Sequence, residues 1–245
     1  MITASFSLPR AAAVLVTAIT SVVVVSCRSS APAPSARSAA TERMDRYYLP
    51  ECAVCAGALG AKGEAVARLY DGRELRFCDE ACARAFDANR PAGFGAVDAR
   101  IVADQAALYP LRTCIVSDRP LPARPVDVVW GNRLFRVAGE PEKARLLADP
   151  GAYTRRLDDA VRAAQTPGYP MARKCPVQGD ILEGDPVIDI VVANRMIRVC
   201  CGRCARVVRA SPYQYLSMVD YARGAASSAA GTERTPDSGD RSNPQ

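Results

Sequence analysis

The feature that most constrains the fold of this chain is a pattern that occurs three times in succession. Each copy opens with a cysteine that follows a tyrosine-containing lead, and these cysteines, Cys52, Cys114 and Cys175, are 62 and 61 residues apart. A pattern that returns at a nearly constant spacing is typical of chains built from similar small units, each packed against its neighbours. The 245 residues are therefore expected to fold as consecutive modules and not around one large core.

A β-hairpin is expected in every copy. Two short apolar stretches flank a turn pair, which is Asp71-Gly72, Gly131-Asn132 or Ala193-Asn194. Asp-Gly and Gly-Asn are typical of tight hairpin turns, and Asn tolerates the positive φ that such turns need. The stretch after each turn alternates apolar, arginine, apolar, which predicts an outward-facing arginine on each return strand. These arginines are Arg76, Arg136 and Arg198.

A short helix is expected after each hairpin. Phe86, Leu146 and Val208 each lie four places after a matching position, held in turn by Cys82, Glu142 and Cys204. This spacing puts an apolar residue one turn further along the same helix face, where it can pack on the hairpin. A second helix, clearest at residues 153–164, is expected to link one unit to the next. The predicted class is α+β, with three tandem hairpin-plus-helix modules and disordered termini.

The composition sets the boundaries. Both ends of the chain are rich in Ser, Ala and polar residues without apolar periodicity, which favours a flexible tether and a disordered tail. The predicted segments are a signal peptide (1–26), a tether (27–46), a first module (47–110), a degenerate second module (111–166), a third cysteine-rich module (167–222) and a tail (223–245).

The first 26 residues read as a targeting segment. An apolar run from residue 11 to residue 25 follows the single charged residue Arg10 and is too short to span a bilayer comfortably. The residues Val24-Val25-Ser26-Cys27 resemble a bacterial lipobox, which implies a lipidated Cys27 as the mature N-terminus. Arg28 after that cysteine implies the outer membrane, with the folded part facing the periplasm. An uncleaved anchor and an ordinary secretory signal are the alternatives.

The complete absence of histidine excludes several kinds of site. A Ser-His-Asp triad, a papain-like Cys-His pair and a histidine-bound zinc or copper ion are all impossible. Any transition metal must therefore be bound by thiolate, carboxylate or backbone. We expect a metal-binding protein without enzymatic activity. The net charge of +6 is small and spread along the chain, so nucleic acid is not an expected partner.

The cysteines are the candidate ligands. The first copy has the pattern Cys-x2-Cys-x22-Cys-x3-Cys, formed by Cys52, Cys55, Cys78 and Cys82. A tetrahedral ion needs four ligands that converge on one point, and two short cysteine pairs brought together by a hairpin supply them. Since thiolates without histidine select zinc or copper(I), the predicted cofactor is one of these ions.

The other two copies depart from this pattern. In the third copy, Gln178 takes the second position and an extra cysteine is added, so that the candidate ligands are Cys175, Cys200, Cys201 and Cys204. Adjacent cysteines cannot easily both point at one ion, so three thiolates and an open position are expected there. The second copy keeps only Cys114, with Ser117, Ala138 and Glu142 at the other positions, and is expected to bind no metal.

The segment from Phe77 to Phe86, with its upstream cysteine pair, resembles the TRASH/YHS group of small heavy-metal-binding modules. The segment from Val199 to Cys204 is similar to a variant found in tandem-repeat bacterial lipoproteins. The resemblance implies a treble-clef-like zinc or copper module used in metal trafficking, buffering, sensing or resistance. It implies one ion in the first module and allows one in the third, with another envelope protein as metal donor or acceptor.

Two other interpretations remain open. In an oxidising compartment the clustered cysteines can form disulfides, so that disulfides or zinc only hold the modules together and the repeat surface binds another protein. The chain can also be a thiol-disulfide redox protein that uses Cys200, Cys201 and Cys204.

Overall fold

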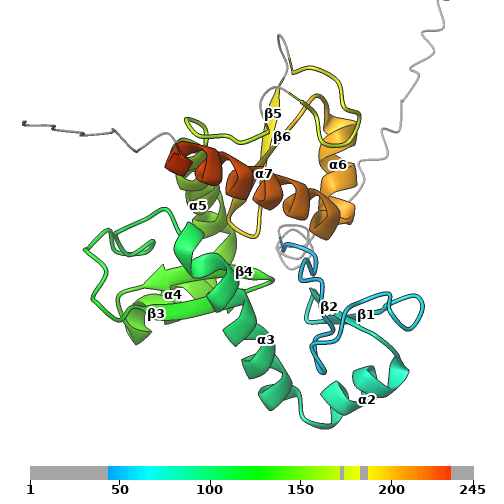
Figure 1. Ribbon diagram of the computed structural model, residues 1–245. Helices are drawn as coiled ribbons and strands as arrows, with labels where there is room; N and C mark the ends of the chain where they lie inside the picture. The colour runs from blue at the N-terminus through cyan, green and yellow to red at the C-terminus, as the bar shows by residue number, and fades with distance from the viewer. Residues whose placement is uncertain (1–43, 172–173, 183–186, 233–245) are drawn as a thin grey trace, which may run out of the picture. The chain divides into compact units, whose positions relative to one another are not determined.

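Each repeat folds as a two-stranded antiparallel hairpin followed by two helices, and the three hairpins form separate sheets (Figure 1). The computed structural model describes residues 44–171, 174–182 and 187–232, all of which belong to one compact unit. The α+β class with three tandem modules is confirmed. We call the repeats module 1 (47–110), module 2 (111–166) and module 3 (from 167 onward).

The three hairpins have the same register. They are β1 (Val66–Tyr70) with β2 (Arg73–Phe77), β3 (Val126–Trp130) with β4 (Arg133–Val137), and β5 (Ile188–Val192) with β6 (Arg195–Val199). Each return strand begins with an arginine that pairs with the last residue before the turn. The turn residues Asp71, Gly72, Gly131, Ala193 and Asn194 have φ between 49° and 87°, as tight hairpin turns require.

The two helices of each module meet at a sharp bend. The pairs are α2 (Glu80–Ala88) with α3 (Arg90–Gln105), α4 (Glu140–Ala148) with α5 (Pro150–Gln165), and α6 (Gly202–Ala210) with α7 (Pro212–Thr232); a 3-10 turn, Ala106–Leu108, follows α3. Asn89 ends α2 and also caps α3, because its side chain accepts the N–H of Ala92. Asp149 does the same between α4 and α5. A proline at the start of each second helix favours this break.

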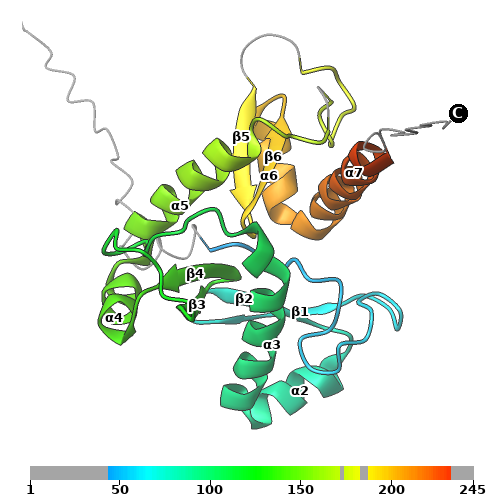
Figure 2. The same ribbon diagram turned by 60° about the vertical axis from the view of Figure 1, so that its left-hand side comes forward.

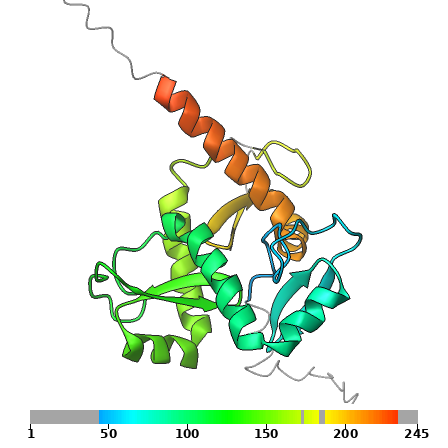
Figure 3. The same cartoon turned by 60° about the horizontal axis from the view of Figure 1, so that its bottom comes forward.

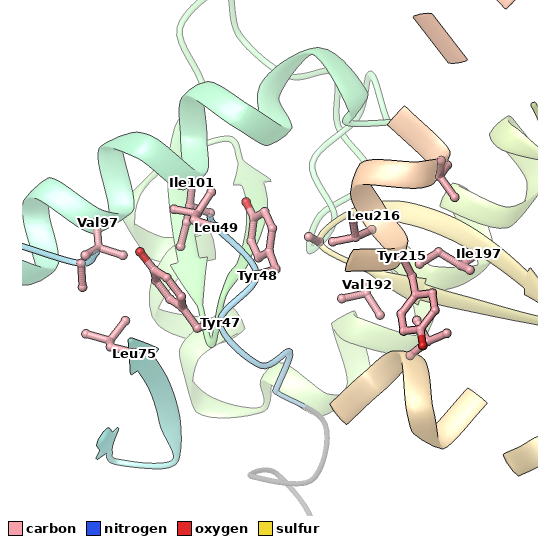
Figure 4. Packing of buried hydrophobic residues seen from close by; sticks show 14 of the residues in the cluster. Tyr47, Tyr48, Leu49, Leu75, Val97, Ile101, Val192, Ile197, Tyr215 and Leu216 are labelled. Carbon is pink, nitrogen blue, oxygen red and sulfur yellow. The ribbon is translucent and has the colours of Figure 1, made fainter. Parts of the chain in front are cut away.

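The buried apolar residues form two clusters. One cluster joins modules 1 and 3, and Tyr47 and Tyr48 of the N-terminal segment lie in it between Leu75 of β2 and Val192 of β5 (Figure 4). The second cluster is centred on module 2 and takes in two side chains of the third hairpin. The helix positions predicted to pack on the hairpins, Phe86, Leu146 and Val208, are at most 1% exposed.

Consecutive modules are joined by a repeated glutamine contact. Helix α3 lies against the second hairpin and α5 against the third (Figure 2). At the end of α3, the Gln105 side chain donates to the carbonyl of Asn132 and accepts the N–H of Leu134, both at 2.9 Å. At the end of α5, Gln165 makes the same two bonds to Asn194 and Met196, at 2.8 and 2.9 Å. Each second helix therefore fixes the turn of the following hairpin.

A buried polar cluster, which we call the hub, connects all three modules. It consists of Asp45, Arg73, Glu74, Asn132 and Arg133. Asn132 accepts a hydrogen bond from Arg73 at 3.0 Å and donates to the Glu74 carbonyl at 2.9 Å. Asp45 pairs with Arg133 at 2.9 Å and accepts the backbone N–H of Ala193 in module 3 at 2.7 Å. Because buried charges are costly when unpaired, these pairs fix the N-terminal segment against modules 2 and 3.

Both ends of the folded part differ from the sequence prediction. Asp45, which was assigned to the tether, is part of the hub, so that the ordered fold includes residues before 47. Helix α7, orange to red in Figure 3, runs to Thr232, past the predicted start of the disordered tail at residue 223. Composition alone misplaced both boundaries, because Asp45 is fixed by partners far along the chain and alanine favours helix. Among the described residues, no helix has the length and apolar character needed to cross a membrane.

Candidate metal centres

The four predicted ligands of module 1 come together at one point. The sulfurs of Cys52, Cys55, Cys78 and Cys82 all lie within 4.8 Å of one another. The Cys55 and Cys78 sulfurs are 3.6 Å apart, and those of Cys78 and Cys82 are 3.4 Å apart. Four thiolates at about 2.3 Å from a tetrahedral zinc ion are separated by about 3.8 Å, so this donor set fits such an ion.

Local structure explains why these sulfurs converge. Cys52 and Cys55 lie in a turn in which the N–H of Ala56 bonds to the Cys52 carbonyl. This turn is held on the return strand by a bond from Ala53 N–H to the Arg76 carbonyl at 2.9 Å. Cys78 directly follows β2, and Cys82 lies in the first turn of α2. The hairpin therefore carries the strand end back to the turn that holds the first cysteine pair.

The backbone around Cys52 favours a thiolate. Burial opposes ionisation of this thiol, but the N–H groups of Cys55, Val54 and Cys78 outweigh it and lower the pKa to about 7. The same influences act on the thiol pKa of the first cysteine in modules 2 and 3. Burial again opposes ionisation, while backbone N–H groups and, at Cys114, the Ser117 hydroxyl lower the pKa of the Cys114 and Cys175 thiols. The three modules therefore share one N–H cradle for the first sulfur.

Cys82 behaves in the opposite way. Its hydrogen bond to Cys78 is the largest cause that raises its pKa, and burial adds to it. The neutral thiol is therefore favoured at Cys82, and a bound cation would be needed to hold all four groups as thiolates. Next to them, Asp79 caps α2 by accepting the Cys82 N–H at 2.9 Å, and Lys62 lies 3.4 Å from the Asp79 carboxylate.

Module 3 brings together three thiols in place of four. The sulfurs of Cys175, Cys200 and Cys204 lie within 4.8 Å of one another. The side-chain oxygen of Gln178, at the position of the missing fourth cysteine, is 3.1 Å from the Cys200 sulfur and 3.5 Å from the Cys204 sulfur. This set offers three soft donors and one weak, exposed oxygen, which leaves a more open coordination position than in module 1.

Cys201 is not part of this group, although the sequence included it among the candidate ligands. It is the N-cap of α6, and its sulfur lies 3.5 Å from that of Cys204 but outside the group of sulfurs that all lie within 4.8 Å of one another. The physical reason is that side chains of adjacent residues at a strand-to-helix junction point in different directions. The N–H of Cys204 is the largest cause that lowers the pKa of the Cys201 thiol.

In module 2 an ion pair occupies the place of the ligand group. Glu142, at the position of Cys82, is 3% exposed and accepts from Arg119 at 2.7 Å. Arg119 follows Cys114 in the turn that corresponds to the turn of Cys52 and Cys55. The pair therefore joins the same two places that four cysteines join in module 1. Within the described ranges, no group of three or more potential ligands includes a residue of module 2.

The sequence predicted the cysteines that converge in the two groups but not their surroundings. The Arg119–Glu142 pair was missed because a single arginine in a turn does not by itself indicate an ion pair. The replacement of cysteine by a glutamate at position 142 was the one signal that could have pointed to it. The N–H cradle depends on backbone geometry and was not visible in the side-chain pattern. The predicted lipidation site, Cys27, lies outside the described residues. The nine described cysteines carry no disulfide bond.

Comparisons with known proteins add no relative: no family model, no curated protein and no solved structure matches this chain. The chemistry of the two cysteine groups is therefore the basis for a functional conclusion.

Proposed function

We propose that the chain is a lipid-anchored protein of the bacterial envelope that binds zinc or copper(I) through cysteine thiolates and serves metal trafficking, buffering or sensing. The observation that carries the proposal is the group of four sulfurs in module 1, all within 4.8 Å of one another. The resemblance to TRASH/YHS modules and the lipobox-like residues before Cys27 support it. The membrane, through the lipid anchor, and an envelope protein that donates or accepts the ion are the proposed partners.

The two groups suit different tasks. Module 1 offers a closed set of four thiolates, which is typical of tightly held ions. Module 3 offers three thiolates and an exposed amide oxygen, so that an incoming ligand can replace the oxygen without breaking a metal–sulfur bond. Module 1 is accordingly the retaining site and module 3 the exchange site.

Metal content and thiol counts of the full chain test the proposal. Protein purified from the periplasmic side should carry close to one ion in module 1, and Cys78→Ser should lose it because one of four ligands is gone. Cys114→Ser is the matched control, since it removes a buried cysteine from the module without a ligand group. Protein with no metal and a single free thiol, that of Cys114, would contradict metal binding and support two disulfides per site.

The competing interpretation is a structural lipoprotein whose zinc or disulfides only stabilise the repeats. A mild chelator separates the two: an exchangeable ion leaves module 3 while the circular dichroism spectrum is unchanged, whereas removal of a purely structural ion unfolds its module. Unfolding of module 3 together with ion loss would contradict an exchange role.

The anchor is tested separately. Cys27→Ser should release a soluble form or leave an uncleaved precursor, because the lipid-bearing side chain is gone. Unchanged membrane fractionation with normal processing would contradict the lipoprotein proposal without affecting the metal sites.

A further inference from the structure

Module 3 contains a cysteine pair that module 1 lacks. Cys201 is the N-cap of α6 and Cys204 is its third residue, and their sulfurs are 3.5 Å apart. Residues three apart at a helix start lie on the same face. In module 1 the same N-cap position is held by Asp79, which accepts the N–H of Cys82. The side chain of Cys201, although it occupies the N-cap position, makes no capping hydrogen bond. Module 3 therefore has a free thiol where module 1 has a capping carboxylate.

Cys204 belongs to two arrangements that exclude each other. It is one of three sulfurs in the ligand group of module 3, 3.6 Å from Cys200, and it is also the neighbour of Cys201. A disulfide requires the two sulfurs to approach from 3.5 Å to about 2.05 Å. A sulfur in that bond is no longer a thiolate and cannot hold the ion. Only Cys175, Cys200 and the Gln178 oxygen would then remain.

The two cysteines of the pair differ in exposure, which determines which thiol an external reagent reaches first. Cys201 is partly exposed, whereas Cys204 is 1% exposed. Because Cys201 stands outside the ligand group, its thiol remains available when the ion is bound. In module 1 all four clustered cysteines belong to the candidate ligand group, so that no thiol of that cluster is left over.

We propose that thiol–disulfide exchange at Cys201 releases the ion of module 3, an inference that rests on the proposed metal binding there. Cys201 attacks an incoming disulfide, R–S–S–R, to form a mixed disulfide and one RS⁻, which takes the Cys201 proton. Cys204 then leaves the ion, attacks the Cys201 sulfur and expels the second RS⁻. Two electrons pass to the incoming disulfide, one Cys201–Cys204 bond forms, and the ion departs because it has lost Cys204, one of its three thiolate ligands.

The test uses the zinc-loaded full chain and oxidised glutathione as the disulfide. Zinc release is followed with a coloured chelator, and the new disulfide is mapped by mass spectrometry. We expect one zinc released per chain with loss of two thiols, and the uptake of zinc restored by dithiothreitol. The ion of module 1 should stay bound. The decisive control is Cys201→Asp, which installs the residue that module 1 has at this position and should bind zinc as the original chain does but retain it.

The outcomes separate the two proposals. A chain that takes up zinc in module 3 and keeps it under oxidised glutathione overturns the release mechanism alone. Equal release rates from the original chain and Cys201→Asp also overturn it, because the ligands would then be oxidised directly. A chain that never takes up zinc in module 3 refutes the metal site there as well as its release. Should Cys201→Asp fail to fold, Cys201→Ser gives the same comparison.

Discussion

The hub makes a quantitative prediction at Asn132. This side chain is fully buried and makes three hydrogen bonds: it accepts from Arg73 at 3.0 Å, and donates to the carbonyls of Glu74 at 2.9 Å and Asp45 at 3.0 Å. Asn132→Ala leaves all three partners without that bond. Each buried polar group left unpaired costs about 1–3 kcal/mol, so the three together give an expected loss of roughly 3–9 kcal/mol in the free energy of unfolding. That is a large share of the stability of a typical domain.

The chain offers a matched control at the same repeat position. Asn194 is also fully buried, but its side chain makes one hydrogen bond, to the Leu134 carbonyl at 3.0 Å, and its oxygen has no partner among the described residues. Asn194→Ala removes that bond and places alanine at a φ of 56°, which together should cost about 2 kcal/mol. The same substitution is therefore expected to be clearly more damaging in module 2 than in module 3.

Urea unfolding of the ion-loaded chain measures both variants. Trp130 is the only tryptophan and lies two residues before Asn132, so its fluorescence reports on the hub, and circular dichroism reports on the whole chain. The expected result is a lower midpoint for Asn132→Ala than for Asn194→Ala. Equal losses, or a loss below about 1 kcal/mol at Asn132, would refute the claim that the hub bonds hold the modules together.

Two further predictions concern module 2 and alkaline stability. The triple substitution Ser117→Cys, Ala138→Cys and Glu142→Cys restores the four-cysteine pattern, so elemental analysis should find one additional ion per chain; unchanged metal content would contradict the repeat alignment. Burial raises the pKa of Tyr47 and of Tyr109 to about 12, from 10.0 in the unfolded chain. The stability that each contributes is therefore complete below pH 10 and falls by roughly 3 kcal/mol as the pH rises to 12. Urea midpoints are measured between pH 10 and pH 12, and the absorbance of tyrosinate records the ionisation of the phenols. Midpoints that do not fall across this window would show that the two phenols are exposed.

Much of the fold and the ligand groups could be predicted because the signals are local. Hairpin turns, alternating strands and cysteine spacing each occupy a few consecutive residues. The hub was not predicted, because Asp45 acts on residues 88 and 148 positions further along the chain. Part of it was nevertheless readable. The polar residues that join the modules also repeat, since Gln165 follows Gln105 by 60 positions. A comparison of polar as well as apolar positions between the repeats would have found these two glutamines.

The ion pair of module 2 bears on why the other modules keep their cysteines. Arg119 and Glu142 connect the turn to the helix as a bound ion would, and the hairpin between them is as regular as the other two. The scaffold can therefore be closed at this point without a metal. If holding the module together were the sole task of the cysteines, the same replacement would serve in modules 1 and 3. Their retention of four and three converging sulfurs favours the proposed role in binding an ion, and the exposed Gln178 oxygen in place of a fourth cysteine is the feature on which the proposed exchange at module 3 rests.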